Sequence, residues 1–237
     1  MMLRVRYASV VKKSRTTHSG SSLNPITHTA DPNILVIVGT QPSVTAFSVN
    51  RATMCWHSVF FQNAMKEDRW KEGEERKVEL PEDEPSVFQT YMDVMFLCDM
   101  EDSYEADVIG DQRRREYKRK ERRLVLSPER IESLCKVYVL AEKLMDNSTT
   151  AYIFSRLAKD FEKSIGAPSL EAVQIIYTGT PTGNQIRKLF TEIYAARGGA
   201  ILFSEGDDIM NAGVEVAPEF LLDLSKSLFS KHQNIKN

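Results

Sequence analysis

The sequence predicts an α+β fold in which a small, mostly N-terminal sheet is covered by helices and followed by additional C-terminal helices. Three observations support this prediction. Strand-like patterns are confined to the first part of the chain, at residues 34–38, 44–49 and 77–80. After residue 85, apolar residues recur mainly at the helical period of about 3.6. The 237 residues, of which 42% are apolar and 27% charged, suffice for one large domain or two small ones with a sizeable core.

The sheet is expected to begin with the β-branched run at residues 34–38. This run is continuously apolar, which is typical of a strand buried on both faces, and a glycine and a proline just beyond it supply a turn. Residues 44–49 alternate in polarity and are predicted to pair with the first strand as a hairpin. Mixed helical spacing over residues 51–65 predicts one or two short helices packed onto that hairpin, and residues 77–80 predict a short third strand.

Six helices are predicted in the remainder of the chain. Start signals precede residues 85–97 and the helix that begins at Ser127-Pro128-Glu129, because a first-turn proline and nearby acids favour a helix N-terminus. The second of these helices is apolar almost all round, so we expect it at the centre of the core. Capping side chains at residues 146–149 introduce the next helix. A helix pair and a last helix complete the prediction, at residues 168–177, 184–196 and 219–229.

Two basic segments interrupt this pattern. Residues 1–30 hold five basic residues and no acid, and they are interpreted as a disordered basic tail; an acid-free N-terminus with arginine and serine also matches a mitochondrial transit peptide, and that alternative stays open. A charged insertion is predicted at about residues 98–126. It is either a solvated segment with its own glutamate partners or a nuclear-localisation or nucleic-acid patch. Its basic residues are Arg113, Arg114, Arg115, Lys118, Arg119, Lys120, Arg122 and Arg123.

The net charge of −2 conceals an uneven distribution. The tail contributes +5 and residues 111–123 contribute a further +5, which leaves −12 on the rest of the chain. An acidic body of this kind argues against general nucleic-acid binding by the body itself. Nucleic acid is therefore not the expected partner, although the two basic segments leave that possibility open.

The cysteines and the hydropathy pattern bear on the compartment. Three cysteines lie far apart in the sequence, an odd and small number that fits a reducing environment. No run approaches the roughly 18 consecutive apolar residues that a membrane span requires. We therefore expect a protein of the cytoplasm, the nucleus or both, without a membrane partner.

No motif in the sequence predicts catalysis, a cofactor or a metal. Residues 133–136 fit the Ser-x-x-Lys pattern but lack the elements that accompany it in enzymes. No glycine-rich phosphate loop is present, and no histidine stands at metal-ligand spacing from a cysteine or an acid. His57 lies two residues after Cys55, but side chains so spaced on a helix diverge. We predict a protein without enzymatic activity, cofactor or metal site.

The order of the predicted elements carries a resemblance to a known family. The segments concerned are residues 31–39, 47–51, 58–61, 78–83 with Phe88, and 134–144. Together they resemble a BTB/POZ domain of the divergent fungal type, over roughly residues 31–165. Asn50 stands where that family usually has a histidine before the arginine, and asparagine also caps helices well. The expected organisation is the tail at residues 1–30, this domain with its charged insertion, and a C-terminal helical extension at residues 166–237.

The resemblance implies a function. Proteins with this domain are interaction modules that commonly self-associate and often link a target protein to the cullin scaffold of a ubiquitin ligase. Protein partners are therefore expected, with a homodimer and a cullin as candidates. Cullin-binding members carry a hydrophobic-x-Glu motif after the third helix, and Leu97-Cys98-Asp99 occupies the corresponding place here. The residues implied in partner binding are Leu97, Cys98, Asp99, Phe88 and Tyr91. The rival interpretation is a nuclear regulatory protein whose basic segments contact nucleic acid and whose BTB-like core dimerises.

Overall fold

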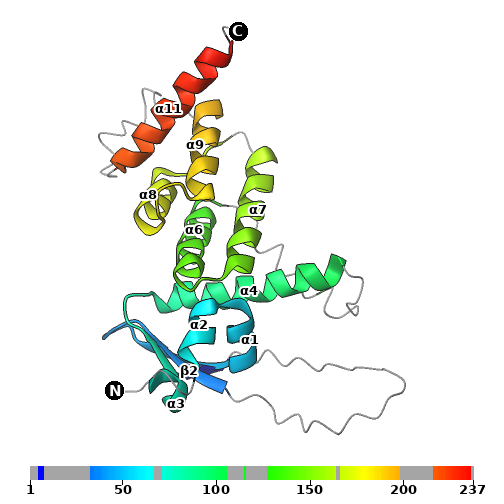
Figure 1. The fold of residues 1–237 in the computed structure, drawn as a ribbon, viewed down its shortest axis with the longest axis vertical. Coiled ribbons are helices and arrows are strands. Elements are labelled where there is room, and N and C mark those ends of the chain that lie inside the picture. The colour runs from blue at the N-terminus through cyan, green and yellow to red at the C-terminus, as the bar shows by residue number, and fades with distance from the viewer. Residues whose placement is uncertain are drawn as a thin grey trace. The chain divides into compact units, whose positions relative to one another are not determined.

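The computed structural model confirms the α+β class, with a small N-terminal sheet and C-terminal helices (Figure 1). It describes residues 5–7, 33–66, 71–105, 115, 127–163, 166–197 and 216–235. For residues 5–7, 71, 100–105, 163 and 231–235 it describes the backbone alone. The chain divides into two compact units, Met1–Phe88 and Gln89–Asn237, and each is described by itself below.

A four-stranded sheet with the order β1-β3-β2-β4 organises the first unit. β2 (Asn33–Val38) and β3 (Thr45–Asn50) form the antiparallel hairpin that the sequence predicts. β4 (Lys77–Leu80) is the predicted third strand and pairs with β2 in parallel. β1 (Val5–Tyr7) pairs in parallel with β3 at the edge. β1 belongs to the stretch predicted as a tail, and the rest of residues 1–30 lies outside the described residues.

The prediction that β2 is buried on both faces is wrong. Ile34, Val36 and Val38 are buried, whereas Leu35 between them is 38% exposed. Successive side chains of a strand point to opposite faces, so only one face of β2 contributes to the core. β-branched and aliphatic residues favour an extended strand even where their side chains are partly exposed, and a continuous apolar run is therefore not proof of two buried faces.

Two short helices follow β3, as predicted, and each begins at a capping side chain. α1 (Arg51–His57) starts after Asn50, whose side-chain oxygen accepts a hydrogen bond from a backbone amide three residues on, at 3.0 Å. α2 (Val59–Ala64) starts in the same way after Ser58, at 3.1 Å. These bonds satisfy amide groups that a helix N-terminus leaves without a partner. A further short helix, α3 (Lys71–Glu75), precedes β4.

α4 (Pro85–Glu105) begins at the predicted proline but is longer than predicted. The break expected after residue 97 is wrong, because acidic residues end the apolar periodicity without ending the helix, and glutamate has a favourable helix propensity. The predicted insertion at about residues 98–126 is therefore helical as far as Glu105. Of the remainder, only Arg115 is described before the next helix starts.

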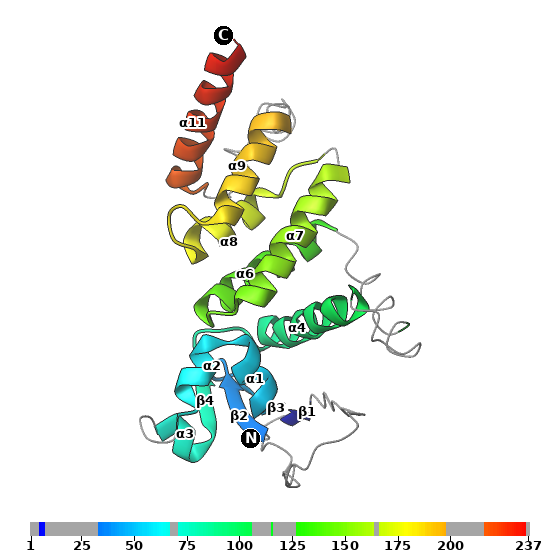
Figure 2. The ribbon, with the colours of Figure 1, turned by 45° about the vertical axis from the view of Figure 1, so that its right-hand side comes forward.

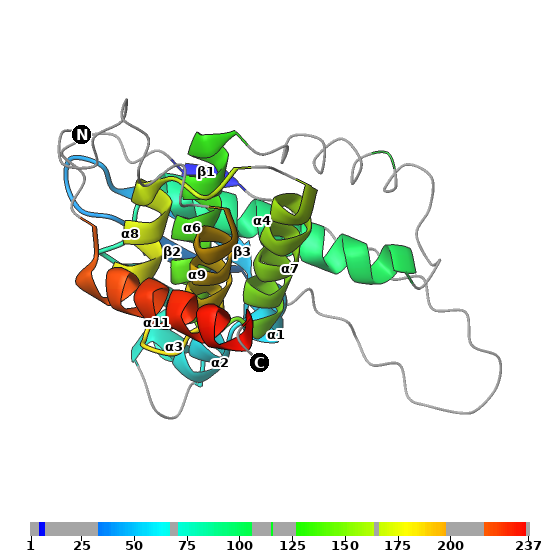
Figure 3. The same ribbon diagram turned by 90° about the horizontal axis from the view of Figure 1, so that it is seen from above.

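The described part of the second unit is helical throughout, in agreement with the sequence (Figure 2). Its helices after α4 are α6 (Pro128–Lys143), α7 (Asn147–Lys163), α8 (Leu170–Gly179), α9 (Gln185–Arg197) and α11 (Pro218–Ile235). α6 packs against both α7 and α8, and α11 lies across α9 and α8 (Figure 3). Seven side chains of α6 are buried, which confirms its predicted central position. No helix within the described residues combines the length and the apolar character needed to cross a membrane.

A buried carboxylate holds the start of α7. Asp146 accepts hydrogen bonds from the backbone amide of Thr149 at 2.9 Å and from its hydroxyl at 2.6 Å. The Tyr91 hydroxyl donates to the same carboxylate at 2.8 Å. Burial, together with the charge of Asp146, raises the pKa of Tyr91, so this phenol stays protonated and remains a donor. The predicted capping role of residues 146–149 is thereby confirmed, and Asp146 carries it.

A buried arginine caps the C-terminal end of α8, at the turn between α8 and α9. Arg187 is 6% exposed, and its Nε donates to the Thr180 hydroxyl at 3.0 Å. Its Nη2 donates to the carbonyl oxygens of Tyr177, at 2.6 Å, and of Thr180. A cation at a helix C-terminus satisfies the last carbonyl groups and complements the helix dipole. The turn between α8 and α9 is therefore held by a charged group that sequence reasoning did not single out.

Candidate binding sites

Four of the five residues implied in partner binding are buried. Phe88, Tyr91, Leu97 and Cys98 all have side chains in the interior, whereas Asp99 is partly exposed. The tripeptide that was matched to the cullin motif lies inside α4 instead of after its end, because α4 continues to residue 105. These side chains serve the packing of the chain itself.

These side chains make specific contacts within the chain itself. The rings of Phe88 and Phe47 lie 5.0 Å apart in the first unit. In the second unit, the Cys98 thiol donates to the carbonyl oxygen of Ser148 at 3.6 Å, and Tyr91 donates to the capping carboxylate described above. A partner that reached these groups would have to replace contacts that stabilise the fold.

The predicted basic patch lies almost wholly outside the described residues. Arg115 is the one member that is described, and it is helical and exposed. The other members are Arg113, Arg114, Lys118, Arg119, Lys120, Arg122 and Arg123. Contact of this segment with nucleic acid stays a prediction.

The first unit exposes an aromatic side chain that sequence reasoning passed over. Trp56 in α1 is 82% exposed, and Val59 at the start of α2 is 44% exposed. We call these two residues the Trp56 surface. A helical signal was available, because Met54 and His57 are three positions apart and face inward, which turns Trp56 to the opposite side. Tryptophan is enriched among the residues that contribute most to protein–protein binding.

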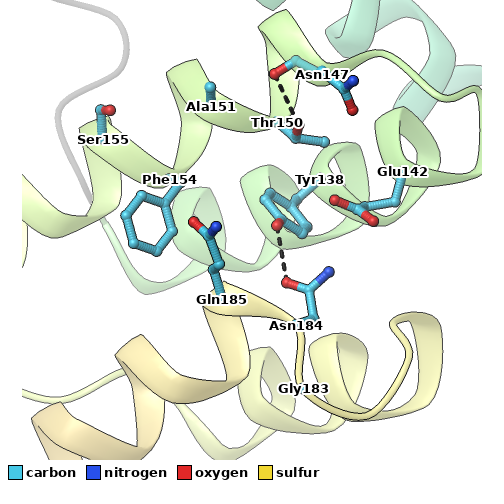
Figure 4. A pocket seen from close by; sticks show the side chains of 10 residues that line it. All are labelled: Tyr138, Glu142, Asn147, Thr150, Ala151, Phe154, Ser155, Gly183, Asn184 and Gln185. Carbon is cyan, nitrogen blue, oxygen red and sulfur yellow. Dashed lines mark hydrogen bonds between the residues drawn. The ribbon is translucent and has the colours of Figure 1, made fainter.

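A cavity of about 400 Å³ opens in the second unit between α6, α7 and the turn before α9 (Figure 4). Its lining combines two aromatic rings, one carboxylate, three amides and two hydroxyl groups besides the phenol. The lining residues are Tyr138, Glu142, Asn147, Thr150, Ala151, Phe154, Ser155, Gly183, Asn184 and Gln185. None of them is basic, so the cavity has an acidic character.

Tyr138 is fixed in one wall of this cavity. Its hydroxyl donates to Oδ1 of Asn184 at 2.9 Å, and the same oxygen accepts the backbone amide of Ile186 at 3.1 Å. Burial raises the pKa of Tyr138 to about 12, and the negative charge of Glu142 acts in the same direction. The phenol is therefore neutral at physiological pH and acts as a donor. In Figure 4 the hydroxyl of Tyr138 points to Asn184, and the Tyr138 ring is drawn between the ring of Phe154 on one side and the carboxylate of Glu142 on the other.

The cysteines and acids elsewhere in the described residues bear on metal binding and thiol chemistry. No group of three or more histidine, cysteine or acidic side chains that could hold a metal ion occurs among them. All three cysteines are free thiols, and burial raises the pKa of Cys135, which disfavours its reactive thiolate. The Trp56 surface and the cavity are thus candidate binding sites within the described part of the chain.

Comparisons with known proteins add nothing to either site. No protein-family model, no curated protein and no solved structure matches the chain. The candidate sites are therefore interpreted from the residues and geometry of this chain alone.

Proposed function

We propose that the chain is a protein–protein interaction module of the BTB/POZ type, which self-associates and recruits protein partners, with a cullin as the candidate scaffold. One observation carries the proposal: the exposed indole of Trp56 beside Val59 on the first unit. Covering an aromatic ring of this kind removes roughly 150–250 Å² from water. At about 25 cal/mol per Å², this burial favours association by roughly 4–6 kcal/mol before the costs of association are subtracted.

The order of elements in the first unit supports the BTB/POZ part of the proposal. The hairpin of β2 and β3, the two short helices and β4, followed by α4, appear in the order of the segments that carry the resemblance. Asn50 and Ser58 act as helix caps at two of the resembling segments.

Self-association is the simplest use of this exposed patch. A two-fold dimer uses the same surface on both copies, so one interface covers both tryptophans. The ring sits on a pair of capped helices and needs little ordering when it is covered, which lowers the entropic cost of binding.

Sedimentation velocity over a range of concentrations tests self-association. We expect the full chain to dimerise and Trp56→Ala to weaken the dimer by about 30-fold or more, the effect of a hot-spot residue. Phe229→Ala is the matched control, because it removes a 71% exposed aromatic ring from α11 and should leave the dimer unchanged. A wild-type chain that stays monomeric at about 100 μM, or equal effects of the two variants, would refute self-association through this surface.

A second measurement tests the adaptor part separately. Isothermal titration of the full chain with a cullin N-terminal domain should give saturable binding if the chain is a ubiquitin-ligase adaptor. Absence of binding would remove the cullin from the proposal, and the result of the sedimentation experiment would still decide self-association.

A further inference from the structure

The cavity in the second unit has the chemistry of a site for a cation. Of its ten lining residues, Glu142 is the only one with a formal charge, and none is basic. The rings of Tyr138 and Phe154 also line it. Aromatic ring faces attract cations through their quadrupole, and carboxylates form strong charge-assisted hydrogen bonds with cationic donors. A ligand of opposite charge therefore gains from both kinds of group at once.

Glu142 is available for such a ligand. Its side chain is partly buried at the wall of the cavity, and among the described residues no lysine or arginine forms an ion pair with it. Its described interactions are its charge effect on Tyr138 and a hydrogen bond with the same residue, one helical turn earlier on α6, and these leave it without a cationic partner among the described residues. A partly desolvated carboxylate without a counter-charge interacts more strongly with an incoming cation than an acid in bulk water does.

The ring of Tyr138 is held in place before a ligand arrives. The hydrogen bond from Tyr138 to Asn184 joins α6 to the turn before α9. The buried side chain of Arg187 holds the start of the same turn through its hydrogen bonds to Tyr177 and Thr180. Because the Tyr138 hydroxyl is hydrogen-bonded to Asn184, the ring cannot rotate out without breaking this bond. Preorganisation of this kind reduces the entropic cost of binding.

The chemical groups of the lining favour a guanidinium group among cations. A guanidinium group is planar, more weakly hydrated than an ammonium group, stacks on aromatic rings and pairs with a carboxylate through two parallel hydrogen bonds. The amide groups of Asn147 and Gln185 also line the cavity and offer further acceptor oxygens for its remaining donors. A volume of about 400 Å³ lies within the usual range of small-ligand pockets.

We propose that this cavity binds a guanidinium group at the carboxylate of Glu142 and the ring of Tyr138, with Phe154 lining the cavity on the other side of Tyr138. The group is carried either by an arginine side chain of a protein partner or by a small free guanidino compound. This binding goes beyond the proposed function and does not depend on the Trp56 surface, which belongs to the other unit.

Methyl NMR of the full chain gives a direct test. Ala151 and Thr150 line the cavity, so their methyl resonances report its occupancy, and the buried Ala46 of the first unit serves as an internal reference. The probe is N-acetyl-L-arginine methylamide, and the control probe is the citrulline analogue, which has nearly the same shape without the charge. We expect saturable shifts of the Ala151 signal with the arginine probe and affinity at least about tenfold weaker with citrulline. Tighter binding of the blocked probe than of free arginine assigns the site to a protein partner, and the reverse order assigns it to a small compound.

Three variants connect the binding to the proposed groups. Glu142→Gln keeps the shape of the side chain and should weaken the arginine probe about tenfold, and Phe154→Leu should weaken it several-fold. Glu192→Gln is the matched control, because it removes an exposed carboxylate from α9 outside the lining and should change nothing. Thermal unfolding of each variant shows that it is folded.

Three results would overturn the proposal. One is the absence of saturable shifts at probe concentrations up to about 20 mM, well above the millimolar range of a weak specific site. Another is equal binding of the arginine and citrulline probes. The third is an equal loss of affinity in Glu142→Gln and Glu192→Gln, which would show that only the net charge matters.

Discussion

Replacement of the buried Arg187 by methionine should destabilise the second unit substantially. The guanidinium group donates to three oxygens at the end of α8, and its Cζ lies 4.6 Å from the centre of the Tyr177 ring. Methionine has a similar length and no hydrogen-bond donor, so it fills the space but leaves these oxygens without their partner. The perturbation therefore tests the hydrogen bonds and the charge more than the packing.

The magnitude follows from the individual contacts. A hydrogen bond to a charged group contributes about 1.5–3 kcal/mol, and a buried carbonyl that loses its donor costs about 1–3 kcal/mol. These values are not additive, and removal of the charge also removes the cost of burying it. We expect a net loss of about 3 kcal/mol in the free energy of unfolding. For a unit of this size, the loss corresponds to a fall of roughly 6–12 °C in Tm.

Urea unfolding monitored by far-UV circular dichroism is the appropriate assay. The signal reports mainly on helices, whereas Trp56 lies in the first unit and reports on that unit by fluorescence. Lys188→Met is the matched control on the neighbouring residue. The Lys188 side chain is 79% exposed and lies 3.9 Å from Glu192, an exposed pair whose loss should cost under about 0.5 kcal/mol.

Arg187→Lys separates charge from geometry. Lysine keeps the positive charge near the helix C-terminus but cannot reproduce the planar arrangement of donors, so we expect about half of the stability to be lost. The reasoning would be refuted if Arg187→Met and Lys188→Met had equal effects on the unfolding midpoint. It would also be refuted if lysine restored full stability, because the directed hydrogen bonds would then be irrelevant.

Three further predictions concern capping, backbone and pH. Asp146→Ala should lower the free energy of unfolding, measured with urea, by about 3 kcal/mol, because it removes both the cap of α7 and the acceptor of Tyr91. Asp146→Asn should retain part of the cap, so equal losses of stability in the two variants would contradict this prediction. Gly39→Ala should lower the free energy of unfolding more than Gly183→Ala does. Both glycines have a positive φ, which carries a penalty of about 1–2 kcal/mol for alanine. Of these two positions, only Gly39 would place the new Cβ 2.8 Å from a backbone oxygen. Burial raises the pKa of Tyr138 to about 12 from 10.0, so its contribution to stability is complete below pH 10 and is lost as the pH rises towards 12. Absorbance at 295 nm should show this phenol ionising above pH 10 and together with unfolding, and a phenolate that forms reversibly near pH 10 in the folded chain would count against it.

The sequence predicted most of the elements, and local physical chemistry explains why. The turn after β2, the caps of α1, α2 and α7, and the proline at the start of α4 all act within a few residues of the chain. Asn50 and Ser58 illustrate this, because each bonds an amide only three residues away. Such interactions involve residues that are close in the sequence, so they can be predicted without knowledge of the tertiary structure.

The errors in the sequence-based prediction come from features that a short window does not contain. The apolar run of β2 does not show whether other elements cover one face of the strand or both, and Leu35 remains partly exposed. The end of α4 was placed where apolar periodicity stops, although a helix with one polar stretch needs no apolar residues there. Of the five residues implied in partner binding, Leu97, Cys98 and Asp99 rest on analogy with a motif, and four of the five are buried because α4 directs its apolar side chains into the interior.

The cavity was beyond reach of the sequence for a related reason. Tyr138 and Asn184 are 46 positions apart, and their hydrogen bond exists only because α8 packs against α6 and the turn after α8 brings Asn184 beside Tyr138. Each lining residue by itself has an ordinary explanation: Asn184 is a helix cap, Phe154 a helix face and Glu142 a solvated acid. What makes them a candidate site is that two rings and a carboxylate line a single hollow, with no basic side chain among its ten lining residues. That property belongs to the packing of three helical segments, so a substitution that preserves every local pattern, such as Glu142→Gln, can still abolish it.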